Sequence, residues 1–330
     1  MGIESSLIAV IALAAMVVLG VKVAGLAYFF GVVVPYIAIF TFLAGFVYRI
    51  IGWARVPVPF RIPTTGGQQY SLPWVKQNKL DNPSTTAGVI GRMALEVLAF
   101  RSLFRNTKFQ LIDGPKIVYQ WEKWLWMAAL AFHYSFLVIF IRHFRFFTEP
   151  VPFFVHMTER VDGLLQLGLP GVYLTDLVFI VAVTYLLLRR LILPQVKYIS
   201  LPADYFPLFL LLGLGISGIF MRYFTKVDVV KVKELAMGLV TFHPTLPEGI
   251  GVLFYIHLFL VCTLFAYFPF SKLMHLGGVF LSPTRNLPND SRMHRHVNPW
   301  NYPVKTHTYA EYEDHFREKM IEAGLPVEKE

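Results

Sequence analysis

Residues 124–146 read WLWMAALAFHYSFLVIFIRHFRF, an apolar run whose charged residues, Arg142 and Arg145, lie close to its end. A helix that crosses a bilayer takes about 20 such residues. His133 and His143 lie ten residues apart within the run. Because imidazole is costly in lipid, a histidine at membrane depth is a candidate functional residue.

A second apolar run, at residues 250–269, carries a similar pair. His257 lies within it, and His275 follows eighteen residues later, just beyond its end. Histidine is the commonest metal ligand in proteins, and many haem irons take two of them. Two histidine pairs on two apolar segments therefore indicate two bis-histidine haems at different depths of a membrane.

The composition of the chain indicates an integral membrane protein. Of its 330 residues, 55% are hydrophobic and 15% are charged, and the mean hydropathy is +0.54. We therefore expect an all-α fold, a bundle of six transmembrane helices. The expected spans are residues 5–21, 27–51, 124–146, 171–191, 205–222 and 250–269. The first span lacks the basic start of a signal peptide, so we expect it to be retained.

The distribution of Lys and Arg predicts the orientation, because basic residues accumulate on the cytoplasmic side of membrane proteins. Ten lie in the connection 53–123, and eight follow residue 269. Both termini are therefore expected in the cytoplasm, with the protein in the cell membrane. Anionic lipid explains the net charge of +9, since no nucleic-acid-binding motif is present.

Cys262 is the single cysteine, and it lies inside an expected span. One thiol supplies neither a disulfide framework nor a four-thiolate iron–sulfur cluster. A C-x-x-C-H motif for covalent haem is also absent from the sequence. Any haem must therefore be held non-covalently, and any iron–sulfur cluster must belong to a partner subunit.

The two histidine-bearing spans cross the membrane in opposite directions under this topology. The expected pairs are His133 with His275, nearer the cytoplasm, and His143 with His257, nearer the outside. Ten helical residues rise about 15 Å and eighteen about 27 Å, so the depths match only if the chain bends. Pro269 can bend or end the second helix. One such histidine alone would favour a packing role, but two pairs favour ligation.

The chain outside the membrane fits a subunit of an assembly. Residues 53–82 are rich in proline and turn formers, which favours an extended docking segment. From Ser84 to Lys108, apolar residues recur at helical spacing among arginines. This pattern predicts a basic amphipathic helix on the membrane surface or beneath a partner. The predicted parts are a two-helix membrane segment (1–52), a cytoplasmic connection (53–123), a four-helix dihaem core (124–269) and a cytoplasmic tail for partner docking (270–330).

Two features of the tail have simple interpretations. His294 and His296 lack cysteine companions, which favours a structural or docking role over a metal site. Residues 311–320 read EYEDHFREKM, a mixture of charges typical of a short solvated helix.

The spacings H-x9-H and H-x17-H resemble those of the gamma-subunit family of respiratory nitrate reductase, whose members are dihaem cytochromes b that oxidise quinol. The resemblance covers about residues 120–280. It implies that His133, His143, His257 and His275 are the axial ligands of two haems b, in the crossed pairing given above.

A closer resemblance covers nearly the whole chain. The additional N-terminal span and the segments 58–74 (VPFRIPTTGGQQYSLPW), 79–96 (KLDNPSTTAGVIGRMALE) and 292–304 (RMHRHVNPWNYPV) are similar to the DsrM family. These are membrane subunits of the complex associated with dissimilatory sulfite reductase. The resemblance implies menaquinol or menaquinone, sulfur respiration and a cytoplasmic iron–sulfur subunit resembling the heterodisulfide reductase catalytic subunit. It also implies further subunits, including a periplasmic multihaem cytochrome c.

A quinol site needs a lipid-accessible hollow beside a haem and a group that can accept protons. We expect it at the outer haem, because quinol oxidation there would release protons outside. Arg142, Arg145, His156, Arg160 and Asp162 are near in sequence. The related nitrate reductase subunits place a basic residue in this connection, which makes His156 and Arg160 the candidates. Ordinary loop charge is the alternative for either residue.

Two other classes of function are compatible with intramembrane histidines. A secondary transporter should show repeated halves and broken helices, but no internal repeat is evident. A haem-free membrane anchor is the second alternative. The absorption of b-type haem discriminates the cytochrome from both.

Overall fold

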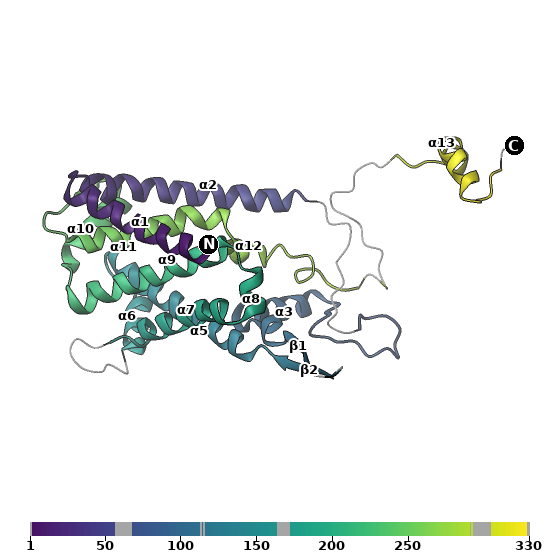
Figure 1. Ribbon diagram of the computed structural model, residues 1–330, viewed down its shortest axis with the longest axis horizontal. Coiled ribbons are helices and arrows are strands. Elements are labelled where there is room, and N and C mark those ends of the chain that lie inside the picture. The colour runs from purple at the N-terminus through teal and green to yellow at the C-terminus, as the bar shows by residue number, and fades with distance from the viewer. Residues whose placement is uncertain are drawn as a thin grey trace.

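The computed structural model describes residues 2–56, 68–112, 114, 116–163, 172–290, 292 and 305–328. It is mostly helical, and its long helices run side by side along the longest axis (Figure 1). These are α1 (Gly2–Lys22), α2 (Val34–Ala54), α5 (Lys123–His143), α7 (Leu174–Ile192), α9 (Pro202–Ile219) and α11 (Val252–Tyr267). Neighbours pack in the order α5, α7, α9 and α11, with α1 against α9 and α11, and α2 against α11.

Among the described residues, five helical segments are long and apolar enough to cross a membrane. They are Gly2–Lys22, Phe29–Ala54, Lys123–Phe146, Pro202–Phe224 and Val252–Phe270, and they correspond to five of the expected spans. The expected fourth span coincides with α7, which contains Asp176, Arg189 and Arg190. These charges shorten its apolar run, so a sixth span stays a prediction.

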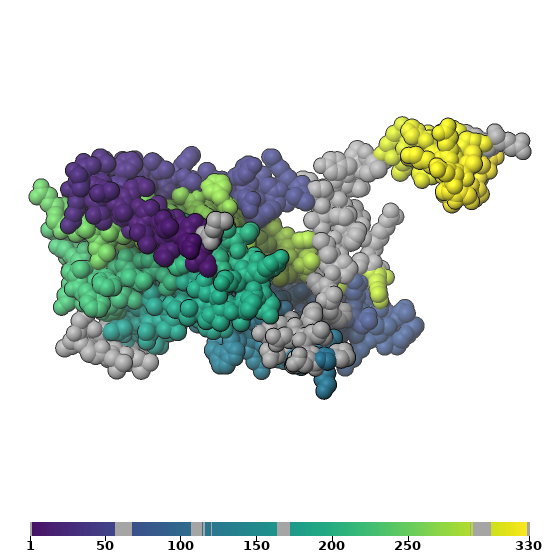
Figure 2. Space-filling model, viewed as in Figure 1, coloured from purple at the N-terminus to yellow at the C-terminus, as the bar shows by residue number. Residues whose placement is uncertain are grey.

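The outward surface of the bundle is largely apolar. Ile8, Leu19 and Phe40 are 62%, 61% and 74% exposed, and α1 and α2 cover part of the face seen in Figure 2. Hydrocarbon solvates such a surface, whereas water does not. Between the helices, fully buried residues such as Val183 and Leu210 form the core.

The helical conformation is interrupted after α11. Tyr267 ends this helix, Pro269 lies in the 3-10 turn that follows, and Ser271 has an extended backbone. A separate short helix, α12 (His275–Gly278), begins after a second turn. Because proline cannot donate the hydrogen bond that continues a helix, this break agrees with the expected effect of Pro269.

Helix α2 packs closely on this break. A Cβ atom at Gly45 would lie 2.7 Å from the Cβ atom of Pro269, and one at Gly277 would lie 2.9 Å from Cδ1 of Ile50. Carbon atoms do not approach so closely. The contact at Gly45 depends on glycine because the ring of Pro269 is rigid, whereas at Gly277 the end of the Ile50 side chain would have to shift. The N-terminal membrane segment therefore packs against the part of the chain that carries His275.

Shorter elements lie at the two ends of the bundle (Figure 1). One end has α3 (Thr86–Ala99), α4 (Arg101–Phe104), β1 (Thr107–Ile112), β2 (Lys116–Trp121) and α8 (Pro194–Ile199); the other has α6 (Phe153–Asp162) and α10 (Val229–Val240). The strands form an antiparallel hairpin with Thr107 opposite Trp121. The residue pattern did not predict this hairpin, because its strands are short and directly precede a membrane helix.

The helix expected over residues 84–108 is divided in the structure, and its apolar residues Ile90 and Leu98 stay exposed within this chain. Helix α3 ends at Ala99, and Phe100 takes a left-handed conformation with φ of 49°. The buried side of α3 carries Arg92 and Glu96 beside a single valine. These polar residues face inward because they join a hydrogen-bonded junction.

Asp81 is the centre of this junction. Its carboxylate pairs with Arg105 and with Arg101, the latter at 3.3 Å, and its backbone carbonyl accepts a hydrogen bond from Arg92 at 2.5 Å. Burial alone raises the pKa of Asp81, but the hydrogen bonds and charges of Arg105 and Arg101 outweigh burial and hold this pKa below its ordinary value. The carboxylate therefore remains ionised at neutral pH.

Asn82 and Asn289 connect the junction to the tail. The side-chain amide of Asn289 donates to Oδ1 of Asn82 at 3.0 Å, and its backbone N–H donates to the carbonyl of Pro83 at 2.6 Å. Arg285 lies 4.0 Å from Glu96. Residues 81–105 and 285–289 thus form one packed unit at the α3 end of the bundle.

Helix α13 (Tyr309–Glu322) confirms the helix expected at 311–320. It begins with a capping box in which the side chain of Thr308 accepts a hydrogen bond from the backbone N–H of Glu311. Other predictions fall outside the described residues, namely those for His294, His296 and the segment 57–67.

The close packing of α2 gives a stability prediction. Gly45→Ala should destabilise the protein by about 1–3 kcal/mol, because the added methyl group overlaps Pro269. Gly52→Ala on the same helix is the matched control, since a Cβ atom there meets nothing within 4 Å. It should preserve or slightly raise stability, because alanine favours helix. Thermal unfolding in detergent measures both, and equal effects would contradict the packing.

Candidate functional site

His133 and His275 meet at the α3 end of the bundle. Their ring centroids lie 5.9 Å apart, and their planes are inclined by 78°. Phe100 and Phe132 flank His133, with ring centroids at 4.9 and 4.7 Å from it. We call His133 and His275 the inner pair, after its expected position.

His143 and His257 meet at the α10 end and form what we call the outer pair. Their ring centroids lie 6.4 Å apart, and their planes are nearly parallel, at 12°. The structure therefore brings the four histidines together in the crossed order expected from the sequence. Their role as haem ligands stays a prediction.

The spacing within each pair suits a metal between two imidazoles. Two metal–nitrogen bonds of about 2 Å place the ring centroids about 6 Å apart. In the part of the chain that the structure describes, no group of three or more His, Cys, Asp or Glu residues could hold a metal ion. Two-histidine pairs suit an iron whose remaining ligands come from a porphyrin, so these residues fit haem.

The hydrogen bonds of the rings also suit ligation. In His133 and His143, Nδ1–H donates to the backbone carbonyl four residues earlier, at 2.7 Å in each case. In His275 it donates to the carbonyl of Lys272 at 2.9 Å. Because a carbonyl can only accept, the proton lies on Nδ1 and Nε2 keeps its lone pair. Metal-ligating histidines typically have this arrangement.

His257 uses a serine for the same purpose. The hydroxyl of Ser217 donates to the carbonyl of Leu214 at 3.0 Å, so its oxygen accepts Nδ1–H of His257 at 2.8 Å. Sequence reasoning missed Ser217. The available signal in the sequence was a hydroxyl residue inside an apolar span.

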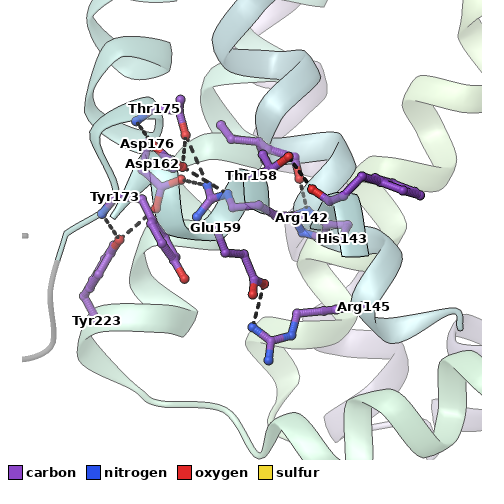
Figure 3. Close-up of polar contacts among 12 residues, drawn as sticks. Arg142, His143, Arg145, Thr158, Glu159, Asp162, Tyr173, Thr175, Asp176 and Tyr223 are labelled. Atoms are coloured by element: carbon purple, nitrogen blue, oxygen red, sulfur yellow. Dashed lines mark hydrogen bonds and ion pairs between the residues drawn. The ribbon is translucent and has the colours of Figure 1, made fainter. Parts of the chain in front are cut away.

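Three charged residues, Arg142, Asp162 and Asp176, form an ionic network beside the outer pair (Figure 3). Arg142 directly precedes His143; its Nε lies 3.3 Å from Oδ2 of Asp162, and its Nη2 pairs with Oδ1 of Asp176. Asp162 also accepts hydrogen bonds from the backbone N–H and hydroxyl of Thr175, at 2.9 and 2.6 Å. The network thus ties together the ends of α5 and α6 and the start of α7.

Two tyrosines enclose the ionic network. The hydroxyl of Tyr223 donates to Asp176 at 2.8 Å and accepts the backbone N–H of Tyr173 at 3.0 Å. The ring of Tyr173 also contacts the guanidinium groups of Arg142 and Arg222, at 4.0 and 4.1 Å from its centroid. The sequence pointed to Arg142 and Asp162 as neighbours of the outer pair, but not to their contact with each other or with Asp176. Charges at the ends of apolar runs were the available signal.

His156 and Arg160, the candidate quinone-binding residues, lie together on α6. With Phe153 and Met157 they line an open hollow of about 280 Å³. Nδ1 of His156 lies 3.8 Å from a carboxylate oxygen of Glu159. Because α6 packs against α5, the hollow lies at the same end of the bundle as the outer pair. Quinone binding there stays a prediction.

Comparison with known proteins identifies the family. Residues 95–294 match the nitrate reductase gamma subunit family. This range contains the four paired histidines, the ionic network and the hollow on α6. The match therefore covers most of the features described above.

Individual relatives agree with this match. The chain is 48% identical over 278 residues to the Hdr-like menaquinol oxidoreductase cytochrome b-like subunit of Archaeoglobus fulgidus, covering 82% of this chain and 83% of the relative. The Archaeoglobus profundus protein of that name is 45% identical over 81% of each chain. The respiratory nitrate reductase 1 gamma chain of Escherichia coli is 29% identical over 46% of this chain and 71% of its own length. The chain therefore belongs to the nitrate reductase gamma subunit family.

Proposed function

We propose that this protein is the dihaem cytochrome b subunit of a membrane complex. The complex exchanges electrons between menaquinol and a cytoplasmic iron–sulfur subunit resembling the catalytic subunit of heterodisulfide reductase. The observation that carries the proposal is the meeting of four histidines from two apolar segments in two pairs. The Archaeoglobus relatives support it, because their names specify an Hdr-like menaquinol oxidoreductase.

The proposed setting is sulfur respiration, with a periplasmic multihaem cytochrome c among the other subunits. This part rests on the resemblance of the additional N-terminal span and of residues 58–74, 79–96 and 292–304 to the DsrM family.

The proposed topology has six spans in the cell membrane and both termini in the cytoplasm. The span added to the five apolar segments is α7, fourth in chain order, whose charged residues have partners. Arg189 lies 3.3 Å from Glu122 at one end of α7, and Asp176 pairs with Arg142 at the other. Between these charges, residues 177–188 are uncharged. Pairing at the ends reduces the cost of placing the charges at a membrane boundary.

In this proposal His133 and His275 hold one iron, and His143 and His257 hold the other. When bound, the haems supply one-electron redox centres at two depths of the membrane. The hydrogen bonds at Nδ1 orient the four rings and keep Nε2 available for ligation.

We place quinol oxidation at the hollow on α6. His156 and Arg160 are positioned there to hydrogen-bond the quinol oxygens, and a ring nitrogen of His156 accepts a proton. Phe153 and Met157 supply apolar contacts to the quinone ring. The open side of the hollow admits a lipid-soluble substrate.

Haem content tests the assignment of ligands. The parent protein should contain ~2 haems b, and substitution of any one of the four paired histidines by alanine should leave ~1, because each pair holds one iron. His156→Ala serves as the control and should retain both. Pyridine haemochrome analysis measures the content. Full content in all four variants would exclude the assignment.

Quinol kinetics test the hollow on α6. His156→Gln and Arg160→Gln should each slow haem reduction by a menaquinol analogue about 10- to 100-fold, because the first removes the proton acceptor and the second removes a charged hydrogen-bond donor to the quinol oxygen. Both haem spectra should stay unchanged. His243→Gln changes an exposed histidine at the same end and should have no effect. Parental kinetics in both hollow variants would remove these residues from the site.

Truncation tests docking of the iron–sulfur partner. Ending the chain after Asp290 keeps the Asn82–Asn289 contact but removes the rest of the tail. This variant should retain both haems, because all four paired histidines remain. It should no longer copurify with the partner, because the proposed docking segment is removed. A second truncation, after Leu281, also removes Arg285 and Asn289. It should therefore unfold the junction around Asp81 locally, because the contacts of these residues with Glu96 and Asn82 are lost. Normal binding of the partner by the shorter chains would exclude the tail as the docking surface.

A further inference from the structure

The ionic network beside the outer pair consists of charges that are withdrawn from solvent. Arg142, Asp162 and Asp176 have side chains only 10%, 2% and 13% exposed. Fixed charges in such surroundings are weakly screened, so their field reaches neighbouring groups with little loss. Arg142 belongs to the same turn of α5 as His143.

The two carboxylates are held in place by hydrogen bonds from several elements. Thr175 binds Asp162 through two donors, and Tyr223 binds Asp176. Their charges therefore stay at fixed positions near His143 and cannot reorient to compensate a change nearby. A flexible surface ion pair differs in this respect, because its charges move and are screened, and it contributes little to stability.

We propose that Arg142 and Asp176 are positioning residues that set the reduction potential of the iron held by the outer pair. The inference rests on the proposed dihaem function. Arg142 raises this potential, because a nearby positive charge favours the added electron. Asp176 lowers it for the opposite reason. As an ion pair these two charges largely offset each other, so the net negative charge of the network is the one contributed by Asp162.

The test is a redox titration of the purified, haem-loaded protein, followed by its visible spectrum. Arg142→Gln should shift the potential of the outer haem downward, and Asp176→Asn should shift it upward. The double substitution should return it close to the parental value, because the two charges are removed together. The potential of the inner haem should stay constant in all three variants and serves as an internal standard.

Two control variants separate charge from structure. Arg145→Gln removes a charge two residues beyond His143, but this arginine is 40% exposed and paired with Glu159 at 2.8 Å. Its shift should be smaller than that of Arg142→Gln. Tyr223→Phe removes the hydrogen bond to Asp176 without changing charge. The net charge of the network stays the same, so the potential of the outer haem should shift less than in any variant that removes a charge.

Each outcome decides the inference. Opposite shifts for the two single variants support it, whereas shifts of the same sign, or no shift, overturn it and leave the network a structural clamp. If Arg142→Gln fails to load the outer haem, Asp176→Asn and the double variant still test the sign. A parent protein without haem would instead refute the proposed function.

Discussion

Each of the four paired histidines hydrogen-bonds Nδ1 to the protein and lies beside a histidine from a distant part of the chain, with ring centroids 5.9 or 6.4 Å apart. This pairing depends on the different shapes of the two histidine-bearing segments. Helix α5 continues unbroken between His133 and His143, whereas the partner segment stops at Tyr267 and restarts at α12. Without that interruption, the longer spacing would carry His275 past the level of His133.

The break is maintained by packing contributed from the N-terminal segment. Gly45 and Gly277 allow α2 to approach both sides of it, so an element that carries no histidine helps to determine where one lies. Small residues have this role in membrane bundles because hydrocarbon offers little drive for helix association, and close contact must replace it. Helices α1 and α2 therefore do more than add membrane-spanning length. Through α2 they also help to position the chain that carries His275.

Charged groups gather at both ends of the bundle, and at each end they join separate segments. At the α10 end, Arg142 ties three helices beside the outer pair; at the α3 end, Asp81 and Asn289 unite the connection with the tail. Buried charges are tolerated there because each carboxylate has several donors. Under the proposed function, this arrangement separates quinol chemistry at one end from partner docking at the other, with the two histidine pairs between them.

The sequence by itself determined the membrane class and five of the spans, because apolar length is a local property of the chain. It also predicted the crossed order of the histidines, because the number of intervening spans makes the two histidine-bearing segments antiparallel. It did not determine the hydrogen bond from His257 to Ser217, the partners of Arg142, the hairpin or the inward face of α3. Those features depend on which residues from distant segments meet, and hydrophobic periodicity carries no such information. On α3 the periodicity predicted an amphipathic helix for a membrane surface or a partner, but it did not predict that Arg92 and Glu96 would be buried against other segments. Only tertiary packing could decide that outcome, since burial of a charged group is favourable only where its partner is already in place.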